Sequence, residues 1–280
     1  MNTTIALFGA GGKMGCRLTD NLLKSTYRLL PVEVSEGGLS RLSQRCLTSI
    51  AQDQAVSEAD IVILALPDTA LGSISHELVP KMKSGAMLMV LDPAAAHARV
   101  LAEREDMPLF VTHPCHPPLW NNEQGAARED FFGGIAAKQN IVCAIERGSD
   151  AQYRRGEDLA RTMYAPVERA HRITVEQMAI LEPAMAETVA AMCCTIIFEA
   201  YQEAIHRGVP AEAAHDFIMG HVNIPLGIVF GVAGNPFSDG ARLIINYGRN
   251  RIINPDWKSV FEPDSVLEQV NAIVSGTAPK

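Results

Sequence analysis

Residues 4–15 read TIALFGAGGKMG, a short apolar run followed at once by a glycine-rich turn. Apolar residues then recur at Met14, Leu18 and Leu22, which is the spacing of one helix face. A strand, a G-x-G-x-x-G turn and a helix in this order are typical of a dinucleotide-binding unit. The segment therefore predicts a Rossmann-type fold at this end of the chain.

Each glycine of the turn has its own expected role. Gly9 permits the tight turn, Gly11 lets the backbone approach a pyrophosphate, and Gly15 lets helix and strand pack closely. The amides at the start of the helix then hold the anion. A purely structural glycine-rich turn is the alternative interpretation. From this segment we expect cofactor contacts from Gly9, Gly11, Gly12, Lys13, Met14 and Gly15.

Strand-like and helix-like segments continue to alternate along the first part of the chain. Residues 29–34, 60–66 and 86–91 are apolar runs, and residues 70–82 form a helical stretch between the last two. Strands that are apolar on both faces and alternate with helices indicate a parallel sheet covered on both sides. Further strands are expected at 109–112, 141–145 and 167–170, with a loop or insertion at 117–134.

The remainder of the chain has a helical texture. No glycine interrupts residues 174–207, and apolar residues surround the whole circumference of residues 189–198. A helix that is apolar all round is buried on all sides. We therefore predict a Rossmann domain at 1–173 and an all-helical domain at 174–280, whose long helix packs partly against a second subunit in a homodimer. A second helix is expected from Pro210 to about residue 231, and no clean periodicity follows it.

Composition excludes several classes of protein. The chain has 24 Lys and Arg against 32 Asp and Glu, and a net charge of −8 is the wrong sign for a nucleic-acid binder. The apolar runs are shorter than the ~18 residues of a membrane span. No signal peptide is recognisable, so we expect a cytoplasmic protein. Six cysteines without a C-x-x-C pair are expected to be reduced thiols.

Acidic residues at strand ends favour NAD as the cofactor. Glu33 follows the second strand at about the distance expected of the carboxylate that holds the adenosine ribose 2′-hydroxyl. Glu33 and the nearby Glu36 would repel the 2′-phosphate of NADP. A solvated acid at a strand end is the alternative for Glu33. The next two strands end in further candidates for the cofactor groove, which are Leu66, Pro67, Asp68 and Asp92.

Two histidines follow a later strand of the same sheet. His113 and His116 lie in the stretch THPCHP at 112–117, where prolines stiffen the backbone. Histidine serves as a general base or as a metal ligand, and both roles need fixed geometry. Two rings that merely cap carbonyl groups are the alternative.

Glu182 is an acid among apolar residues at the start of the long helix, directly before Pro183. A carboxylate in such surroundings must be paired, neutralised or bound to a cation. A divalent cation shared with His113 would satisfy it, whereas a solvated acid or an arginine partner is the alternative. Glu187 is a weaker candidate of the same kind.

Further polar residues occur in the second helical stretch and beyond. His221 and Asn223 stand two positions apart in an apolar helix. An arginine fork suits a substrate carboxylate, although an ordinary solvated or interface face is the alternative. The downstream cluster consists of Arg242, Asn246, Arg249 and Arg251.

Six motifs together resemble one small family of 6-phosphogluconate-dehydrogenase-like and ketol-acid-reductoisomerase-like oxidoreductases, the D-apionate oxidoisomerases. The His113 and Glu182 segments are the distinguishing ones, and the resemblance covers essentially the whole chain. The motifs are GAGGKMG at 9–15, ALPD at 65–68, DP at 92–93, THPCHP at 112–117, LEPAMAE at 181–187 and GHVNIPLG at 220–227.

The resemblance implies NAD-dependent oxidation of the 2-hydroxyl of a branched sugar acid, followed by metal-assisted migration of a hydroxymethyl group to give 3-oxo-isoapionate. In common β-hydroxyacid dehydrogenases the long helix presents a lysine and an asparagine, but residues 173–206 contain neither. A Lewis-acidic cation held by His113 and Glu182 is the expected replacement. His116, or His113 if it is not a ligand, would be the base. The expected catalytic set is His113, His116, Glu182, His221 and Asn223.

Two other functions remain open at this point. One is a plain NAD-dependent dehydrogenase of a 2- or 3-hydroxy acid, without rearrangement. The other is an NAD-sensing module that has kept the fold and lost catalysis.

Overall fold

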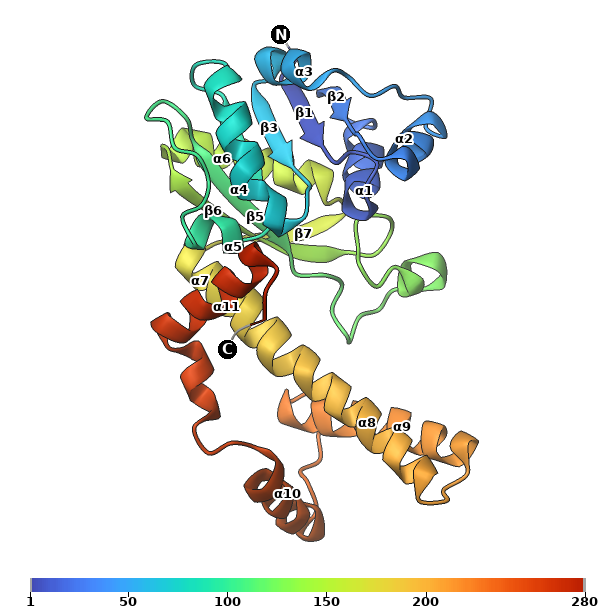
Figure 1. Cartoon of the computed structure of the whole chain (residues 1–280). Helices are drawn as coiled ribbons and strands as arrows, with labels where there is room; N and C mark the ends of the chain where they lie inside the picture. The colour runs from blue at the N-terminus through green and yellow to red at the C-terminus, as the bar shows by residue number, and fades with distance from the viewer. Residues whose placement is uncertain (1, 279–280) are drawn as a thin grey trace. The chain divides into compact units, whose positions relative to one another are not determined.

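The structure is a computed structural model that describes residues 2–278. Its centre is a seven-stranded sheet of order β2-β1-β3-β4-β5-β6-β7 (Figure 1). The expected strands are present with small shifts at their ends. They are β1 Thr4–Phe8, β2 Arg28–Val32, β3 Ile61–Leu64, β4 Met87–Val90, β5 Leu109–Pro114, β6 Gln139–Arg147 and β7 Val167–Arg172.

The sheet is parallel from β2 through β5, as predicted, but β6 pairs antiparallel with β5 and β7 continues in the direction of β6. A parallel return needs a crossover connection, usually a helix. The chain between β5 and β6 contains only the short 3₁₀ turn η2, Gly125–Glu129, so β6 returns along β5 in the opposite direction.

Helices cover both faces of this sheet, which makes the fold a doubly wound α/β fold. Alternate residues of β1 belong to different cores: Ala6 and Phe8 pack with α3, α4 and α5, whereas Ile5 and Leu7 pack with α1 and α6. The helices are α1 Lys13–Leu22, α2 Glu36–Ser43, α3 Gln52–Glu58, α4 Asp68–Leu78 with the 3₁₀ turn η1 Val79–Lys81, α5 Ala94–His97 and α6 Asp150–Met163.

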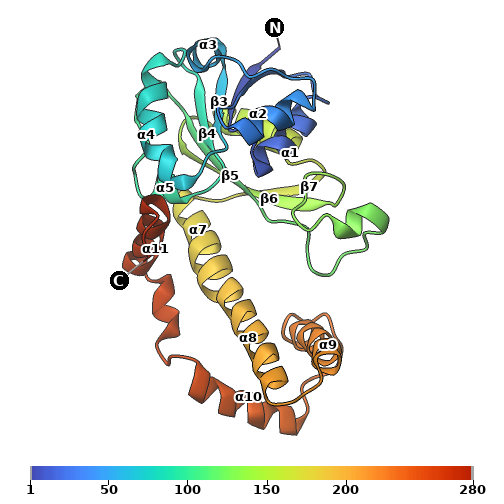
Figure 2. The ribbon, with the colours of Figure 1, turned by 45° about the vertical axis from the view of Figure 1, so that its right-hand side comes forward.

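The chain after β7 is entirely helical among the described residues. A single uninterrupted helix, Val175–His206, comprises α7 Val175–Ala179, the π-helical segment η3 Ile180–Ala191 and α8 Met192–His206 (Figure 2). One helix forms where the sequence showed no clean periodicity, because Ser238 caps α10 by accepting a hydrogen bond from the Ala241 amide. The remaining elements are α9 Ala211–Val229, α10 Asp239–Ile252, the 3₁₀ turn η4 Trp257–Phe261 and α11 Pro263–Ser275.

The chain divides into two compact units that differ from the expected ranges 1–173 and 174–280. The first unit is Met1–Pro183 together with Val266–Lys280, and the second is Ala184–Ser265. The first unit takes in the start of the long helix because Val175 and Met178 pack into the core of the sheet. Most of α11 belongs to it as well, with Val270 fully buried.

The long helix is not buried on all sides within one chain, so its expected packing against a second subunit stays a prediction. No residue of α8 is buried. By length and composition this helix could cross a membrane, with a mean hydropathy of 1.5 over its most apolar window, of which 11% is buried. The sequence criterion counted uninterrupted apolar residues, whereas a window average tolerates the occasional polar residue. One such helix is weak support for a span, since core helices of soluble proteins pass the same test.

Candidate active site

The glycine turn between β1 and α1 is held at the end of β2. The amides of Gly9 and Ala10 both donate to the Val32 carbonyl, at 2.9 and 3.2 Å. Gly9 has φ +73°, and a Cβ atom there would lie 2.2 Å from the Ala65 carbonyl oxygen. A side chain on Gly15 would meet the Gly9 carbonyl at 1.9 Å. Both positions therefore require glycine for the reasons given from the sequence.

Gly11 has an additional neighbour in the structure. A Cβ atom at Gly11 would lie 2.2 Å from the carbonyl oxygen of Gly38 in α2, so two backbone segments meet directly at this point. Gly12 caps α1 without a side-chain hydrogen bond, and no acidic residue stands in the first turn, where Lys13 and Met14 lie. The start of α1 thus has the character of an anion site.

Glu33 lies directly beside this turn. Its Oε2 atom accepts a hydrogen bond from the Gly11 amide at 3.0 Å, and its Oε1 atom accepts three from Val34 and Ser35. Burial acts to raise the pKa of the Glu33 carboxyl, but hydrogen bonds from Ser35, Val34 and Gly11 outweigh it and hold the pKa below its ordinary value. Glu33 is therefore an anion, and Oε2 keeps an acceptor position for a ribose hydroxyl.

The ends of β3 and β4 place two more acids at the same edge of the sheet. Leu66 and Pro67 follow β3, and Asp68 opens α4. Asp92 follows β4 and accepts a hydrogen bond from the Ala94 amide at 2.8 Å. In an open α/β sheet ligands bind at the carboxyl ends of the strands.

Asp92, His113 and Glu182 form one cluster at this edge. Each contributes one ligand atom, and the three atoms all lie within 4.8 Å of one another. The His113 Nε2 atom lies 3.7 Å from Glu182 Oε1, with the two side chains only 19% and 23% exposed. That separation is too long for a hydrogen bond. It suits two ligands of one cation, since ligand atoms at about 2.0–2.6 Å from an ion lie up to about 5 Å apart.

The His113 ring is oriented by the backbone. Its Nδ1 atom lies 2.8 Å from the Pro114 carbonyl oxygen. Because a carbonyl oxygen only accepts hydrogen bonds, Nδ1 is the donor, and in the neutral ring the Nε2 lone pair then lies on the side of Glu182. This is the usual arrangement of a metal-binding histidine. Pairing of His113 with Val142 of β6 fixes the backbone beneath the ring.

Glu182 is brought to the sheet edge by the first turns of the long helix. Thr174 caps this helix with a capping box, and Met178 and Ala179 are fully buried against the sheet. The helix then changes to π-helical geometry at Ile180, with Pro183 inside it. π-helical turns occur frequently at functional sites. Glu182 belongs to the same compact unit as His113, so the cluster lies within that unit.

Asp92 is a member of the cluster that the sequence assigned only to the cofactor groove. Burial raises the pKa of its carboxyl to about 6, and the charges of Asp68 and Glu182 act in the same direction. Burial also raises the pKa of Asp68, again with Glu182 adding to the effect. Three acids crowded in this way repel one another, and a bound cation relieves that repulsion.

His116 lies next to the cluster. Its ring meets that of His113 edge-on, with the centroids 5.9 Å apart. Nδ1 lies 2.9 Å from the Phe132 carbonyl oxygen, so this ring also keeps its lone pair on Nε2. The residue has φ +60°, which is uncommon for a residue other than glycine and is found at strained functional sites.

The candidates from the helical region lie in the second compact unit, which is described by itself. The His221 ring stacks on Phe217 at 3.9 Å, and its Nδ1 atom donates to the Phe217 carbonyl. Asn223 lies two residues further along α9. Arg242 is 3.9 Å from Asp239, and Arg251 lies over the Tyr247 ring. The parts of these residues in the reaction, and those of Glu187, Asn246 and Arg249, stay predictions.

The donor set of the cluster fits a divalent cation. Two carboxylates and one imidazole offer hard oxygen ligands with one nitrogen, as Mg²⁺, Mn²⁺, Ca²⁺ and Zn²⁺ accept. No thiol takes part, which argues against a site for a soft metal. Cys115, the nearest cysteine in sequence, lies outside this group of ligand atoms.

Known proteins with similar sequences match this chain over nearly all of its residues. D-apionate oxidoisomerase from Rhizobium rhizogenes is 45% identical over 97% of this chain and 99% of its own. The enzyme of the same name from Cupriavidus necator is 45% identical over 98% of this chain and 100% of its own. Residues 121–274 match the family phosphogluconate dehydrogenase (decarboxylating) C-term.

A solved structure shares the whole architecture. It is a semialdehyde dehydrogenase NAD-binding protein from Cupriavidus necator in complex with calcium and NAD, 45% identical, with a TM-score of 0.94 over 98% of this chain and 100% of that one. The chain therefore belongs to the D-apionate oxidoisomerase family, and its residues 121–274 belong to the C-terminal family of the decarboxylating phosphogluconate dehydrogenases.

Proposed function

We propose that this protein is an NAD-dependent oxidoisomerase that converts a branched sugar acid, D-apionate, to 3-oxo-isoapionate. The observation that carries the proposal is the Asp92, His113 and Glu182 cluster at the carboxyl edge of a dinucleotide-binding sheet. Relatives that span the whole chain are named D-apionate oxidoisomerase, and one similar protein binds NAD and calcium.

The first unit binds the dinucleotide in this proposal. The glycine turn and the start of α1 hold the pyrophosphate, and the Glu33 carboxylate accepts a hydrogen bond from the adenosine ribose. Leu66, Pro67 and Asp68 line the groove between the adenosine and the reacting carbon. NAD supplies the hydride acceptor when bound.

Asp92, Glu182 and the Nε2 atom of His113 hold the divalent cation. The cation supplies Lewis acidity next to the two substrate oxygens that change between hydroxyl and carbonyl. The fixed ring of His113 sets the direction of one ligand, and the two carboxylates balance the positive charge. Asp68 remains close enough to influence Asp92 electrostatically without being a ligand.

His116 is the base of the reaction. Its Nε2 atom accepts the proton of the 2-hydroxyl while hydride leaves C2 for the nicotinamide. The oxidised substrate is a 2-keto acid with a tertiary alcohol on the neighbouring carbon. One hydroxymethyl group then migrates with its bonding electrons from C3 to C2, while the proton of the C3 hydroxyl passes to the C2 oxygen, so that C2 becomes a tertiary alcohol and C3 a ketone. His221, Asn223 and the arginines of α10 are candidates for contacts with the substrate's hydroxyl and carboxylate groups.

The experiment is a screen of NAD reduction over branched and linear aldonic acids, with and without a chelator, followed by ¹³C NMR of the product. We expect turnover on D-apionate, loss of turnover with the chelator, and a product whose carbon skeleton has changed. An unchanged skeleton would make the protein a plain hydroxy acid dehydrogenase. NAD binding without turnover on any of these acids would make it a binding module.

We also infer that the protein is a cytoplasmic homodimer that works in carbohydrate metabolism and spans no membrane. The support is the apolar surface of its helical unit, where Phe198 is 57% exposed and Phe217 66%. Monomeric soluble proteins rarely expose large contiguous apolar patches. Packing of the long helix against a second copy would bury it without a bilayer. The net charge of −8 favours neither nucleic acid nor anionic lipid as a partner.

A further inference from the structure

The Glu33 carboxylate occupies a small anion site built by the chain itself. Its two oxygens accept hydrogen bonds from three backbone amides, those of Gly11, Val34 and Ser35, and from the Ser35 hydroxyl, all at 2.9–3.0 Å. Three consecutive or converging N–H groups and a hydroxyl are the donors that proteins also present to phosphate.

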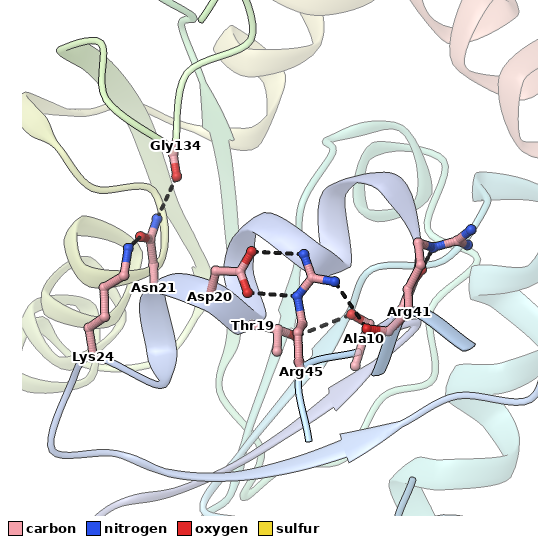
Figure 3. Close-up of polar contacts among 9 residues, drawn as sticks. Ala10, Thr19, Asp20, Asn21, Lys24, Arg41, Arg45 and Gly134 are labelled. Carbon is pink, nitrogen blue, oxygen red and sulfur yellow. Dashed lines mark hydrogen bonds and ion pairs between the residues drawn. The ribbon is translucent and has the colours of Figure 1, made fainter. Parts of the chain in front are cut away.

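An arginine is fixed beside the same glycine. The Arg41 Nε atom donates to the Gly11 carbonyl at 2.6 Å, so Gly11 is bound through its amide by Glu33 and through its carbonyl by Arg41. Figure 3 shows the terminal nitrogens of Arg41 turned away from the neighbouring Asp20 and Arg45 pair. Within residues 2–278 these nitrogens form no ion pair with an acid, so the charged end of Arg41 is available to a ligand.

The position of Arg41 is supported by a second arginine. Arg45 binds Asp20 of α1 through two hydrogen bonds, at 2.6 and 2.9 Å, and donates a third to the Arg41 carbonyl at 3.0 Å (Figure 3). The bidentate pair therefore ties the segment just after α2 to α1, and the third bond ties the same guanidinium to the backbone of Arg41. An arginine held at its backbone and at Nε is preorganised for recognition of an anion.

Two glycines in the first turn of α2 leave room for the Glu33 carboxylate and the Arg41 guanidinium. A Cβ atom at Gly38 would lie 2.3 Å from the Glu33 carboxyl carbon. A Cβ atom at the preceding Gly37 would lie 3.5 Å from Arg41 Nη1. The Glu33 carboxylate and the Arg41 guanidinium thus lie against neighbouring residues of one helical turn.

We propose that Glu33, Ser35 and Arg41 together decide between NAD and NADP, with the Glu33 carboxylate occupying a latent site for the 2′-phosphate of which Arg41 is the cationic member. This inference rests on the dinucleotide site of the proposed function. In Rossmann folds an acid at this position binds the ribose 2′-hydroxyl, and a nearby arginine accommodates a 2′-phosphate. This chain carries both an acid, Glu33, and an arginine, Arg41. NAD is preferred because the Glu33 carboxylate already occupies the amide and hydroxyl donors that a 2′-phosphate would need.

Removal of the carboxylate reverses the electrostatics of the site. Glu33→Ala leaves the amides of Gly11, Val34 and Ser35 and the Ser35 hydroxyl without their acceptor, beside a fixed guanidinium. A phosphate replaces that acceptor with three oxygens and gains a bidentate contact with arginine. The ribose hydroxyl of NAD, in contrast, loses its acceptor. Glu33→Ala therefore strengthens the binding of NADP and weakens the binding of NAD.

The test is calorimetric titration of the full-length protein with NADH and with NADPH. In the wild type we expect NADH to bind at least about tenfold more tightly than NADPH. Glu33→Ala should tighten NADPH at least about tenfold and weaken NADH. Adding Arg41→Ala to that variant should abolish the gain, whereas Arg41→Lys should keep part of it. The exposed acid Glu105, in the loop before β5, is the control, and Glu105→Ala should change either Kd by less than about threefold.

Arg41→Ala in the wild-type background covers the case in which Glu33→Ala fails to fold. It should raise the ratio of the NADPH Kd to the NADH Kd, a ratio that a merely structural role of Arg41 would not move. Three results would overturn the inference: an unchanged ratio in Arg41→Ala, no tighter NADPH binding in a folded Glu33→Ala protein, or a gain that survives Arg41→Ala. Absence of any dinucleotide binding by the wild type would instead overturn the proposed function.

Discussion

Asp92 is the residue at which the site's chemistry and the protein's stability oppose each other. A buried carboxyl near two other acids stabilises the fold only when it is protonated or bound to a cation. The charge of His113 acts to lower the pKa of Asp92, but it does not outweigh burial. The cluster therefore resembles many functional sites, where groups are held in an arrangement that the fold alone would not favour.

Asp92→Asn should stabilise the metal-free protein near neutral pH. The pKa of Asp92 is raised from 3.8 to about 6 in the folded state, so the folded protein binds this proton more tightly than the unfolded one. The free energy of unfolding then falls as pH rises from about 4 to 6, by about 3 kcal/mol for two pKa units.

Thermal unfolding of the wild type and of Asp92→Asn across pH 4–8, both in chelator, measures this effect. The variant should lack that part of the pH dependence, melt higher at pH 7 and no longer gain stability from a divalent cation. A variant that is less stable than the wild type at pH 7 would show that the carboxylate has a favourable partner.

Glu182→Gln and His113→Asn should each lower turnover by at least about 100-fold, because the first removes the negative charge of one cation ligand and the second removes the imidazole nitrogen. NADH binding to the first unit should change less than about threefold. Glu176→Gln is the matched control, since Glu176 is an exposed acid on the same helix. Steady-state kinetics and NADH titration check this, and a variant with near wild-type turnover at saturating cation would contradict it.

For single residues, the sequence pointed to His113 and Glu182 as a pair, which the structure brings to 3.7 Å, but it did not point to Asp92 as a third member. The imidazole of His113 directly follows the strand expected at 109–112, and the acid Glu182 lies inside an apolar run. Polar side chains in such segments can be recognised from the sequence as candidates for a site. Asp92 precedes a proline at the end of a strand, where aspartate is common for reasons of turn geometry. Its proximity to Glu182 depends on how the long helix packs against the sheet, which no local pattern contains.

Among the elements, the π-helical segment Ile180–Ala191 decides where the Glu182 side chain points. Pro183 lies inside it and supplies no backbone N–H, which weakens regular α-helical bonding at this point. A local departure from α-geometry that costs stability and carries a functional side chain is typical of π-helical turns.

Pro183→Ala should therefore raise the melting temperature and weaken cation binding. Alanine adds a backbone donor and removes a cost of up to about 3 kcal/mol of proline inside a helix. The segment can then return toward α-helical geometry, which rotates Glu182 away from His113. Unfolding scans and titration with Mn²⁺ test this, with Ala184→Ser as the control. Unchanged Mn²⁺ affinity together with a higher melting temperature would show that the π-turn does not position Glu182.

The elements themselves were predictable to different degrees. Strands β1 to β5 follow from their apolar runs, because a strand buried on both faces leaves a continuous signal. The reversal of β6 was not predictable, since its direction depends on the connection after His116 and not on its own residues. The helix α10 was missed because its apolar residues Leu243, Ile244 and Ile245 are exposed in the chain and show no single buried face.

For the whole molecule, the apolar surface of the helical unit is the feature that a single chain does not explain. Exposed large apolar residues occur on α8, α9 and α10. The sequence indicated correctly that the long helix is apolar all round, but it gave no information on which atoms cover it. In the proposed homodimer, atoms of the second copy cover it.

Phe198→Glu should convert a dimer into monomers. A charge introduced on the exposed apolar face of α8 is costly to bury against a second copy but tolerated in water. Light scattering should give about twice 30.3 kDa for the wild type and about 30.3 kDa for the variant, while the neighbouring Glu199→Gln stays dimeric. A monomeric wild type, or a dimeric Phe198→Glu protein, would contradict the proposed assembly.

The proposed chemistry is tested most directly by anomalous scattering from crystals grown with NADH and Mn²⁺. We expect a strong peak about 2.0–2.6 Å from a carboxylate oxygen of Asp92, a carboxylate oxygen of Glu182 and Nε2 of His113. A crystal with NADH bound and Mn²⁺ elsewhere, or with no peak among these three side chains, would contradict the account.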